Sequence, residues 1–229
     1  MALLLGAAIE AQPLSQARIV SLKSSLTVQR PGRSPQPLQL HDSVSAGDEL
    51  VTGPKSRAVI RTPDGATVRI FPDSRVVFSD PVPSAPEFLR LFLGSIKIRI
   101  EKLSGRPNPH TITTPTAIIA VRGTKFSVFV EKDTSTLVAV DEGVVAVANV
   151  QEPSRELLLR HGQKSWIRPG QPPMQAMRFR GRSEHARMSS GQRPGGMEGG
   201  MEGGMPGGMR GPVGMGGGSR GMGGMGRRR

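Results

Sequence analysis

The 229-residue sequence contains no cysteine and no tyrosine, and it has only one tryptophan and seven phenylalanines. Without cysteine the chain cannot form a disulfide scaffold, a thiolate metal site or a thiol nucleophile. With so few aromatic side chains, the core has to be built from valine, isoleucine, leucine and alanine. No apolar run approaches the roughly 18 residues that a membrane-spanning helix needs. These absences exclude cysteine chemistry and leave the redox compartment open.

Motifs of catalysis are also missing from the sequence. It has no P-loop, no dinucleotide fingerprint and no glycine-serine-glycine nucleophile elbow. The four histidines are far apart and none has metal-ligand spacing to another, so we expect surface or turn positions for His41, His110, His161 and His185. The sequence therefore predicts no catalytic residue, no cofactor and no enzymatic activity.

The positive charge is unevenly distributed along the chain. The net charge is +13, but residues 1–170 carry 21 basic and 15 acidic groups, while the remaining 59 residues carry 10 basic and 3 acidic groups. The first part is thus mildly basic and the tail is a cationic arm. Because the first part lacks aromatic runs that could stack on bases, we do not expect nucleic acid to be the partner.

Residues 47–78 have the pattern of consecutive strands. Short apolar-alternating runs are separated there by turn residues, which is typical of antiparallel β-structure. We expect residues 58–60 and 68–70 to pair across the turn Pro63-Asp64-Gly65, because Asp-Gly tolerates the backbone angles of a tight hairpin.

Further strands are predicted on both sides of this block. Isoleucines alternate with cations over residues 96–100, which indicates one buried face, and the apolar run 116–121 suggests a strand buried on both faces. Residues 38–40 are predicted to form a short edge strand, and residues 137–140 to pair with 144–150 across Asp141-Glu142-Gly143. No amphipathic helix is apparent. The predicted fold is all-β, a small antiparallel sandwich or roll, with a short β-solenoid as the alternative.

A series of short motifs, in order, resembles the FecR domain, a periplasmic module of signalling proteins. The resemblance covers about residues 45–168 and rests on Gly47-Asp48-x-Leu50-x-Thr52, Ser56-x-Ala58-x-Ile60, Asp64-Gly65-Ala66, Pro72-x-Ser74, residues 89–94, residues 113–117, residues 121–126, residues 138–145 and His161-Gly162-Gln163. It implies a non-enzymatic module outside the inner membrane that acts through protein contacts. Sigma-factor control, known for members with an added membrane helix and cytoplasmic segment, is not implied by these motifs.

The most recognisable motif residues are expected to have structural roles at turns. They are Gly47, Asp48, Asp64, Gly65, Arg122, Gly123, Thr124, Glu142 and Gly143. Glycines at such positions supply backbone conformations that other residues disfavour. We expect Asp141 or Glu142 to be the partner of Arg122. The alternative is that Arg122 and Lys125 face a binding partner.

The two ends of the chain differ in character from the middle. Residues 1–17 resemble the apolar part of a truncated secretory signal peptide, and a frayed or helical N-terminus of a cytosolic protein is the alternative. Residues 18–170 are assigned to the FecR-like β-domain. Residues 171–229 are rich in glycine, methionine and arginine and are predicted to be a disordered tail. This organisation predicts a periplasmic or secreted protein of the cell envelope.

The tail allows a second class of function. Met197, Met201, Met205 and Met209 recur every four residues, and thioether sulfur is a soft ligand that suits Cu(I). The simpler interpretation is a flexible arm whose methionines bind nothing. The arginines could instead bring the tail to an anionic surface or envelope polymer. The main hypothesis remains a β-module that binds an unidentified envelope protein or polymer.

Overall fold

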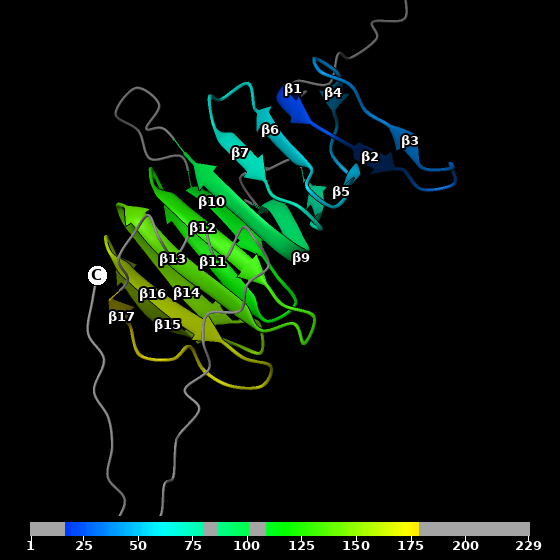
Figure 1. The fold of residues 1–229 in the computed structure, drawn as a ribbon. Helices are drawn as coiled ribbons and strands as arrows, with labels where there is room; N and C mark the ends of the chain where they lie inside the picture. Colours follow the sequence, from blue (N-terminus) through cyan, green and yellow to red (C-terminus); the bar gives the residue numbers. More distant parts are fainter. Residues whose placement is uncertain (1–16, 80–86, 101–108, 179–229) are drawn as a thin grey trace, which may run out of the picture. The chain divides into compact units, whose positions relative to one another are not determined.

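The computed structural model describes residues 17–79, 87–100 and 109–178 (Figure 1). Every regular element in these ranges is a strand, which confirms the all-β prediction. The strands are β1 (Ala17–Lys23), β2 (Leu26–Gln29), β3 (Gln36–Pro37), β4 (Ser43–Val44), β5 (Glu49–Thr52), β6 (Arg57–Arg61), β7 (Thr67–Ile70), β8 (Arg75–Phe78), β9 (Glu87–Arg99), β10 (Pro109–Thr113), β11 (Ala117–Arg122), β12 (Lys125–Val130), β13 (Thr136–Glu142), β14 (Val144–Asn149), β15 (Glu152–Arg160), β16 (Gln163–Ile167) and β17 (Met177–Arg178). Among the described residues, no helix has the length and apolar character that crossing a membrane requires.

The strands form two ladders that meet in β9. The ladder called sheet A has the order β4-β1-β6-β7-β9-β12-β13-β16-β17. The ladder called sheet B has the order β3-β2-β5-β8-β9-β10-β11-β14-β15. All of these pairings are antiparallel except that of β9 with β10, which is parallel. Mainly antiparallel pairing of this kind fits the predicted sandwich or roll and not the stacked parallel coils of a solenoid.

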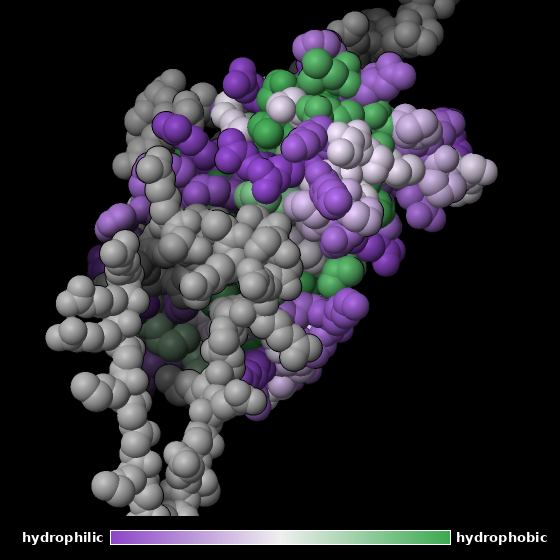
Figure 2. Space-filling view, in the orientation of Figure 1, coloured by the Kyte–Doolittle hydropathy of each residue, from purple (hydrophilic) through white to green (hydrophobic). Residues whose placement is uncertain are grey.

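The two sheets share one hydrophobic core. Buried side chains of both sheets belong to a single cluster, and its largest fully buried members are Phe126, Ile19, Leu26, Leu50, Ile60, Ile70, Leu89, Leu91, Ile96, Ile98, Ile112 and Ile119. Nearly all of them are aliphatic, as the composition requires. Because strand side chains alternate between faces, each strand presents its other face outward. Hydrophilic residues gather over the region of β6 and β7 in Figure 2.

Strand β9 passes from sheet B into sheet A at Gly94. Residues 89–93 pair with β8 in sheet B, whereas residues 96–99 pair with β7 in sheet A. Gly94 has a φ of 87°, which L-residues rarely adopt. A Cβ atom there would lie 2.3 Å from Ser74 Oγ, 2.6 Å from Ser74 Cα and 2.7 Å from the Asp73 carbonyl oxygen. Only glycine meets both requirements without displacement of the neighbouring turn.

The turn that contacts Gly94 is held by buried hydroxyl groups. The Ser95 amide donates to Ser74 Oγ at 2.9 Å, and the Ser74 amide donates to Thr52 Oγ1 at 3.0 Å. The Thr52 hydroxyl donates in turn to the Phe71 carbonyl at 2.6 Å. Ser74 and Thr52 are only 1% and 2% exposed. Unpaired polar groups at such depth would be costly, so these bonds fix β5, β8 and β9 to one another.

Two of the predicted pairings have different outcomes. Residues 58–60 pair with 68–70 as predicted, with Ile60 opposite Val68. Residues 137–140 do not pair with 144–150, so that prediction is wrong. Strand β13 instead pairs with β12 and β16 in sheet A, while β14 pairs with β11 and β15 in sheet B. The turn at Gly143 therefore carries the chain from one sheet to the other, which lets both strands bury one face in the shared core.

Three further local predictions can be compared with the structure, and two of them need correction. The run 116–121 is buried on one face only, since Ala120 is exposed and Ile118 is half-buried. The short edge strand comes at Gln36–Pro37 and not at residues 38–40. The isoleucine alternation over residues 96–100 is confirmed, because Ile96, Ile98 and Ile100 are buried. Period-two alternation is thus the dependable signal in this chain, and continuous apolar runs are not.

The described part of the chain extends to residue 178, eight residues beyond the boundary predicted for the β-domain. The Met174 amide donates to the Trp166 carbonyl at 2.9 Å, the Ser165 hydroxyl donates to the Met174 carbonyl at 2.6 Å, and β17 pairs with β16. This segment runs along the outer edge of sheet A. The predicted signal peptide, apart from Ala17 in β1, and the tail beyond residue 178 lie outside the described residues and remain predictions.

Replacing Gly94 by alanine tests the crossing point. We expect Gly94→Ala to lower the free energy of unfolding by about 2–4 kcal/mol, because left-handed strain and overpacking add there. Urea unfolding followed by the fluorescence of the single tryptophan, Trp166, measures the loss.

Gly65→Ala is the matched control for this substitution. Gly65 has a similar φ of 85°, but a Cβ atom there would meet nothing within 4 Å. It should lose only the strain contribution of about 1–2 kcal/mol. Equal losses in the two variants would show that the close approach of β9 to the Ser74 turn is unimportant.

Candidate functional site

The Gly47-Asp48 motif holds a loop in place. The Arg30 guanidinium donates to both Asp48 carboxylate oxygens, at 2.6 and 2.9 Å, and the Ser45 amide donates to the same carboxylate at 3.0 Å. Asp48 is 3% exposed. This hydrogen-bonded pair raises the pKa of Arg30 above its usual value. All of these contacts are made within the domain, which is compatible with the structural role that the sequence predicts, and that role stays a prediction.

The Asp64-Gly65 motif makes a contact that the sequence does not predict. Asp64 Oδ2 lies 3.0 Å from Nε2 of His110, and the Thr62 hydroxyl also donates to this carboxylate. These hydrogen bonds, that of His110 first, lower the pKa of Asp64 to about 2. The bond ties the β6–β7 turn of sheet A to the start of β10 in sheet B.

His110 is accordingly not the surface or turn histidine that the sequence predicts. Its side chain is 2% exposed, and its ring centroid lies 4.9 Å from that of Phe88. Among the described residues, its Nδ1 atom has no hydrogen-bond partner. No local pattern signals this contact, because 46 residues separate Asp64 from His110.

The glycines of the two remaining motifs form adjoining corners. Gly123 and Gly143 have φ values of 63° and 87°, and a Cβ atom on Gly143 would lie 2.7 Å from Thr124 Cγ2. Thr124 is 2% exposed, and its hydroxyl has no partner within the described ranges. The turns from β11 to β12 and from β13 to β14 therefore pack against each other, which explains why these motifs occur together.

The acidic residues of these corners pair with lysines of sheet A. Asp141 lies 3.1 Å from Lys97, and Glu142 lies 3.1 Å from Lys125. Both carboxylates are candidates in the sequence for pairing with Arg122, whose side chain lies outside the described part. Lys125 is thus part of an ion pair, and the alternative that Arg122 and Lys125 face a partner stays a prediction.

The structure offers little for metal or small-molecule chemistry in its described part. No group of three or more histidine or carboxylate side chains there could hold a metal ion. An open cavity of about 470 Å³ lies beside the loop after β2, where Arg30 is already paired with Asp48 and Glu49 with Arg75. The methionines proposed for copper, Met197, Met201, Met205 and Met209, and also His185, lie outside the described residues.

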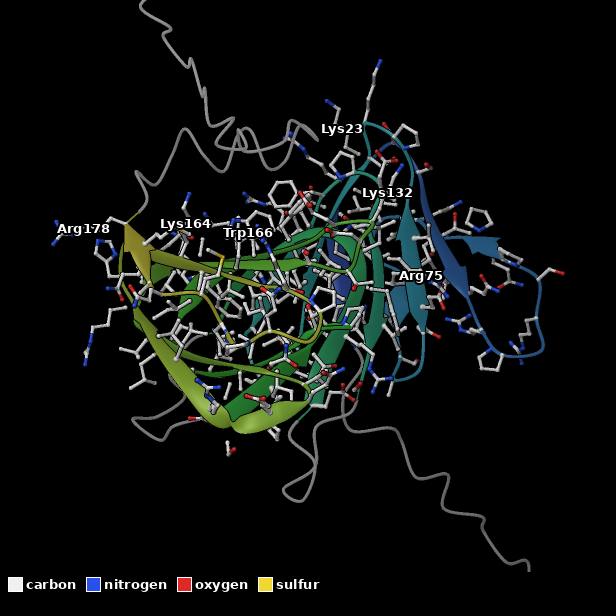
Figure 3. All side chains as sticks on the ribbon, turned by 90° about the horizontal axis from the view of Figure 1, so that it is seen from below. Lys23, Arg75, Lys132, Lys164, Trp166 and Arg178 are labelled. Carbon is white, nitrogen blue, oxygen red and sulfur yellow. The ribbon has the colours of Figure 1, made fainter. Side chains whose placement is uncertain are left out.

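The outer edges of the two sheets are protected to different degrees. Strands β3, β4 and β17, each at an edge, have two residues apiece, and β3 contains Pro37. The edge of β16 is further covered by the segment at Met174, near the labelled Trp166 and Arg178 in Figure 3. In contrast, β15 has nine residues and pairs only with β14. Within the described ranges it is the one long edge that lacks a second neighbour.

The open edge of β15 presents main-chain groups outward at Leu158. The Val150 amide, just after β14, donates to the carbonyl of Thr116, just before β11, at 3.0 Å. Because hydrogen-bonded pairs alternate along an antiparallel ladder, the even-numbered residues of β14 bond to β11 and the odd-numbered ones to β15. Leu157 and Leu159 therefore bond to β14, and Leu158 points its amide and carbonyl away. The Arg160 amide also points away, since it donates to the Gln163 side chain at 2.7 Å.

The side chains of β15 divide into a charged part and an apolar part. Residues 152–156 include Pro153 and three charged residues, which discourage strand addition. Leu158 is 54% exposed and is followed by Arg160. On the outer face it lies opposite Ala146, which in turn lies opposite Ala120. An added strand would thus find an apolar centre with charges on both sides.

Substitution of Asp64 tests the buried contact with His110. The folded-state pKa of about 2 lies below the usual value of 3.8, so this carboxylate stabilises the fold above about pH 4 and loses its contribution as the pH falls toward 2. We expect Asp64→Asn to reduce stability at pH 6 and to flatten the decline between pH 4 and 2. Urea midpoints across this pH range measure the effect.

Asp73→Asn is the control for the decline of stability between pH 4 and 2. Asp73 also lies at a left-handed turn position, with a φ of 53°, but it has no side-chain hydrogen bond within the described residues. Its substitution should leave the pH dependence of wild type intact. If Asp64→Asn loses stability between pH 4 and 2 as steeply as wild type, the role assigned to the contact with His110 is contradicted.

Comparisons with known proteins agree with the β-structure. No curated protein matches the sequence. Two crystal structures of a proposed anti-sigma factor from Parabacteroides distasonis ATCC 8503 are similar, with TM-scores of 0.51 and 0.50 and 16% sequence identity. The matches cover 61% and 60% of this chain and 63% of the other chain, so this chain spans less than two thirds of that protein. At this identity the likeness concerns the fold.

A family model gives the more specific result. The model described as FecR protein matches residues 48–146, which run from the start of β5 into β14 and include the motifs at Asp48, Asp64, Gly123 and Gly143. The observed match is shorter than the span of residues 45–168 expected from the sequence. Residues 48–146 of this chain are therefore similar to the FecR protein family.

Proposed function

We propose that this chain is a non-enzymatic binding module of the cell envelope, whose β-domain holds an extended segment of a partner protein at the edge of β15. The observation that carries the proposal is the open edge at Leu158, where a main-chain amide and carbonyl and an apolar side chain are exposed together. Strand addition is a common way for β-domains to bind extended peptides.

The family supports a regulatory setting for such binding. The resemblance to FecR modules implies a protein that acts through protein contacts outside the inner membrane. The family match over residues 48–146 supports the same setting for this chain. The structurally similar protein is a proposed anti-sigma factor, and a protein partner would fit that description. The periplasm or the cell surface is the location that this proposal requires.

The edge also suggests the chemistry of the partner segment. A strand added beside β15 would place one side chain against the exposed Leu158 and others near Glu156 and Arg160, which are exposed as well. Opposite charges favour cross-strand neighbours, and like charges disfavour them. We infer an apolar residue at the centre of the segment, with a basic residue facing Glu156 and an acidic residue facing Arg160.

Blocking the edge tests the proposal. We expect Leu158→Pro to reduce capture of the partner from an envelope extract of the source organism by at least about tenfold, because it removes an amide that faces away from β14. Leu158→Lys should have a similar effect by placing a charge on the edge. Val144→Lys is the control, since Val144 is 40% exposed on the neighbouring strand but is not at the edge.

Hydrogen exchange identifies the surface directly. Binding should slow exchange at the amide of Leu158 in the full chain and in Val144→Lys, while the tryptophan fluorescence confirms that each variant is folded. Equal capture by wild type and both Leu158 variants would overturn the proposal. The proposal would also be overturned if the wild-type protein forms a dimer, captures no other protein, and becomes monomeric in the Leu158→Lys variant. A second copy of the chain would then occupy the edge.

A further inference from the structure

On the outer face of sheet A, cationic side chains of neighbouring strands lie directly opposite one another. Four cross-strand pairs have two positive side chains each, and they are Arg18 with Arg61, Lys23 with Arg57, Arg69 with Lys97, and Arg99 with Lys125. Like charges at directly opposed positions destabilise a sheet. Pairs of this kind lie on β1, β6, β7, β9 and β12, and they act against the stability of the fold where no anion neutralises them.

Among the described residues, carboxylates neutralise positive charge on one side of this face. Asp141 and Glu142 lie 3.1 Å from Lys97 and Lys125 at the β12–β13 side. Toward β1, no ion pair involves Arg18, Lys23, Arg61 or Arg69 within the described part of the chain, and all four are exposed. Arg57 lies over the Phe71 ring at 5.8 Å. In Figure 3, Lys23 lies on the outer side of its strand.

The geometry of the face restricts the kind of anion that fits it. Sheet strands are about 4.8 Å apart, and side chains on one face repeat about every 6.8 Å along a strand. The cations thus form a two-dimensional array, and the cavity of about 470 Å³ lies elsewhere, beside the loop after β2. Five of the eight cations are arginines, whose planar guanidinium groups bind phosphate through two hydrogen bonds.

We propose that this cationic face, centred on Arg18, Arg61 and Arg69, docks on the phosphate headgroups of an anionic lipid bilayer. A bilayer presents many mobile phosphates in one plane, so it can match such an array without a concave site. An acidic protein would need fixed carboxylates at corresponding positions. The neutralisation of opposed cations on contact would recover the stability that their repulsion removes from the free protein.

The test uses two full-length triple variants with equal net charge. The face variant is Arg18→Gln/Arg61→Gln/Arg69→Gln, and the control is Arg33→Gln/Arg155→Gln/Arg168→Gln, whose arginines are exposed elsewhere. Both changes lower the net charge from +13 to +10 and leave the basic residues beyond 178 unchanged. Co-sedimentation is measured with vesicles of phosphatidylglycerol and phosphatidylcholine and with vesicles of phosphatidylcholine alone.

Wild type should bind the anionic vesicles and not the neutral ones. The face variant should bind them on the order of a hundredfold more weakly, since each surface cation contributes roughly a fivefold factor, whereas the control should lose less than about tenfold. The urea midpoint of the face variant should also rise, because opposed charges are removed.

Three results would overturn the proposal. They are equal loss of vesicle binding in the two variants, a lower urea midpoint for the face variant than for wild type, and binding to poly-glutamate that depends on these three arginines while vesicle binding does not. The last result would assign the face to an acidic protein.

Discussion

The passage of β9 between the two sheets is the constraint on which the rest of the domain depends. One strand supplies neighbours to β7 and β12 in sheet A and to β8 and β10 in sheet B. The change of sheet requires a backbone angle and a close approach that only glycine provides at Gly94. The Ser74 and Thr52 hydroxyls then satisfy the polar groups buried at this point. Without this crossing, the strands before and after β9 would have no shared core.

The two outer faces that result have different chemistry. On sheet A, cations of neighbouring strands lie opposite one another, and only the β12–β13 side has carboxylate partners among the described residues. On sheet B, the row through Ala120, Ala146 and Leu158 is apolar and ends at the open edge of β15. A stable fold does not need either feature, since charged opposition and open edges both reduce stability or solubility. Their presence on separate faces is the reason to assign two binding roles to one domain.

Much of the fold could be predicted from local sequence signals. Alternation over residues 96–100 and the Asp-Gly turn at residue 64 act over a few residues, and both predictions are confirmed. The partner of β13 could not be predicted, because a turn such as that at Gly143 can either form a hairpin or change sheets. The distinction depends on which strands are already paired, which is information about distant residues. The same limit applies to the contact between His110 and Asp64.

The candidate sites show the same division. The motif residues Asp48, Gly123 and Gly143 lie at turns and make contacts within the domain, and their predicted structural role rests on these contacts. The open edge at Leu158 could not be predicted, because the apolar run 157–159 gives no sign of whether a further strand lies beside it. The opposed cations on sheet A are not visible in the sequence either, because cross-strand register depends on distant residues. The bulge after Ile19 in β1, which shifts the register that brings Lys23 opposite Arg57, is one example. The number of charged residues in the sequence predicts a mildly basic domain, but it does not predict which face carries the cations.

Residue-resolved hydrogen exchange of the free, full-length protein tests the central claim most directly. If β9 joins the two sheets and β15 is an open edge, the amides of Ile96 and Ile98 should exchange most slowly. The amides of Leu157 and Leu159 should then be protected, while that of Leu158 between them exchanges rapidly. Uniform protection along β15, or rapid exchange throughout β9, would contradict this account.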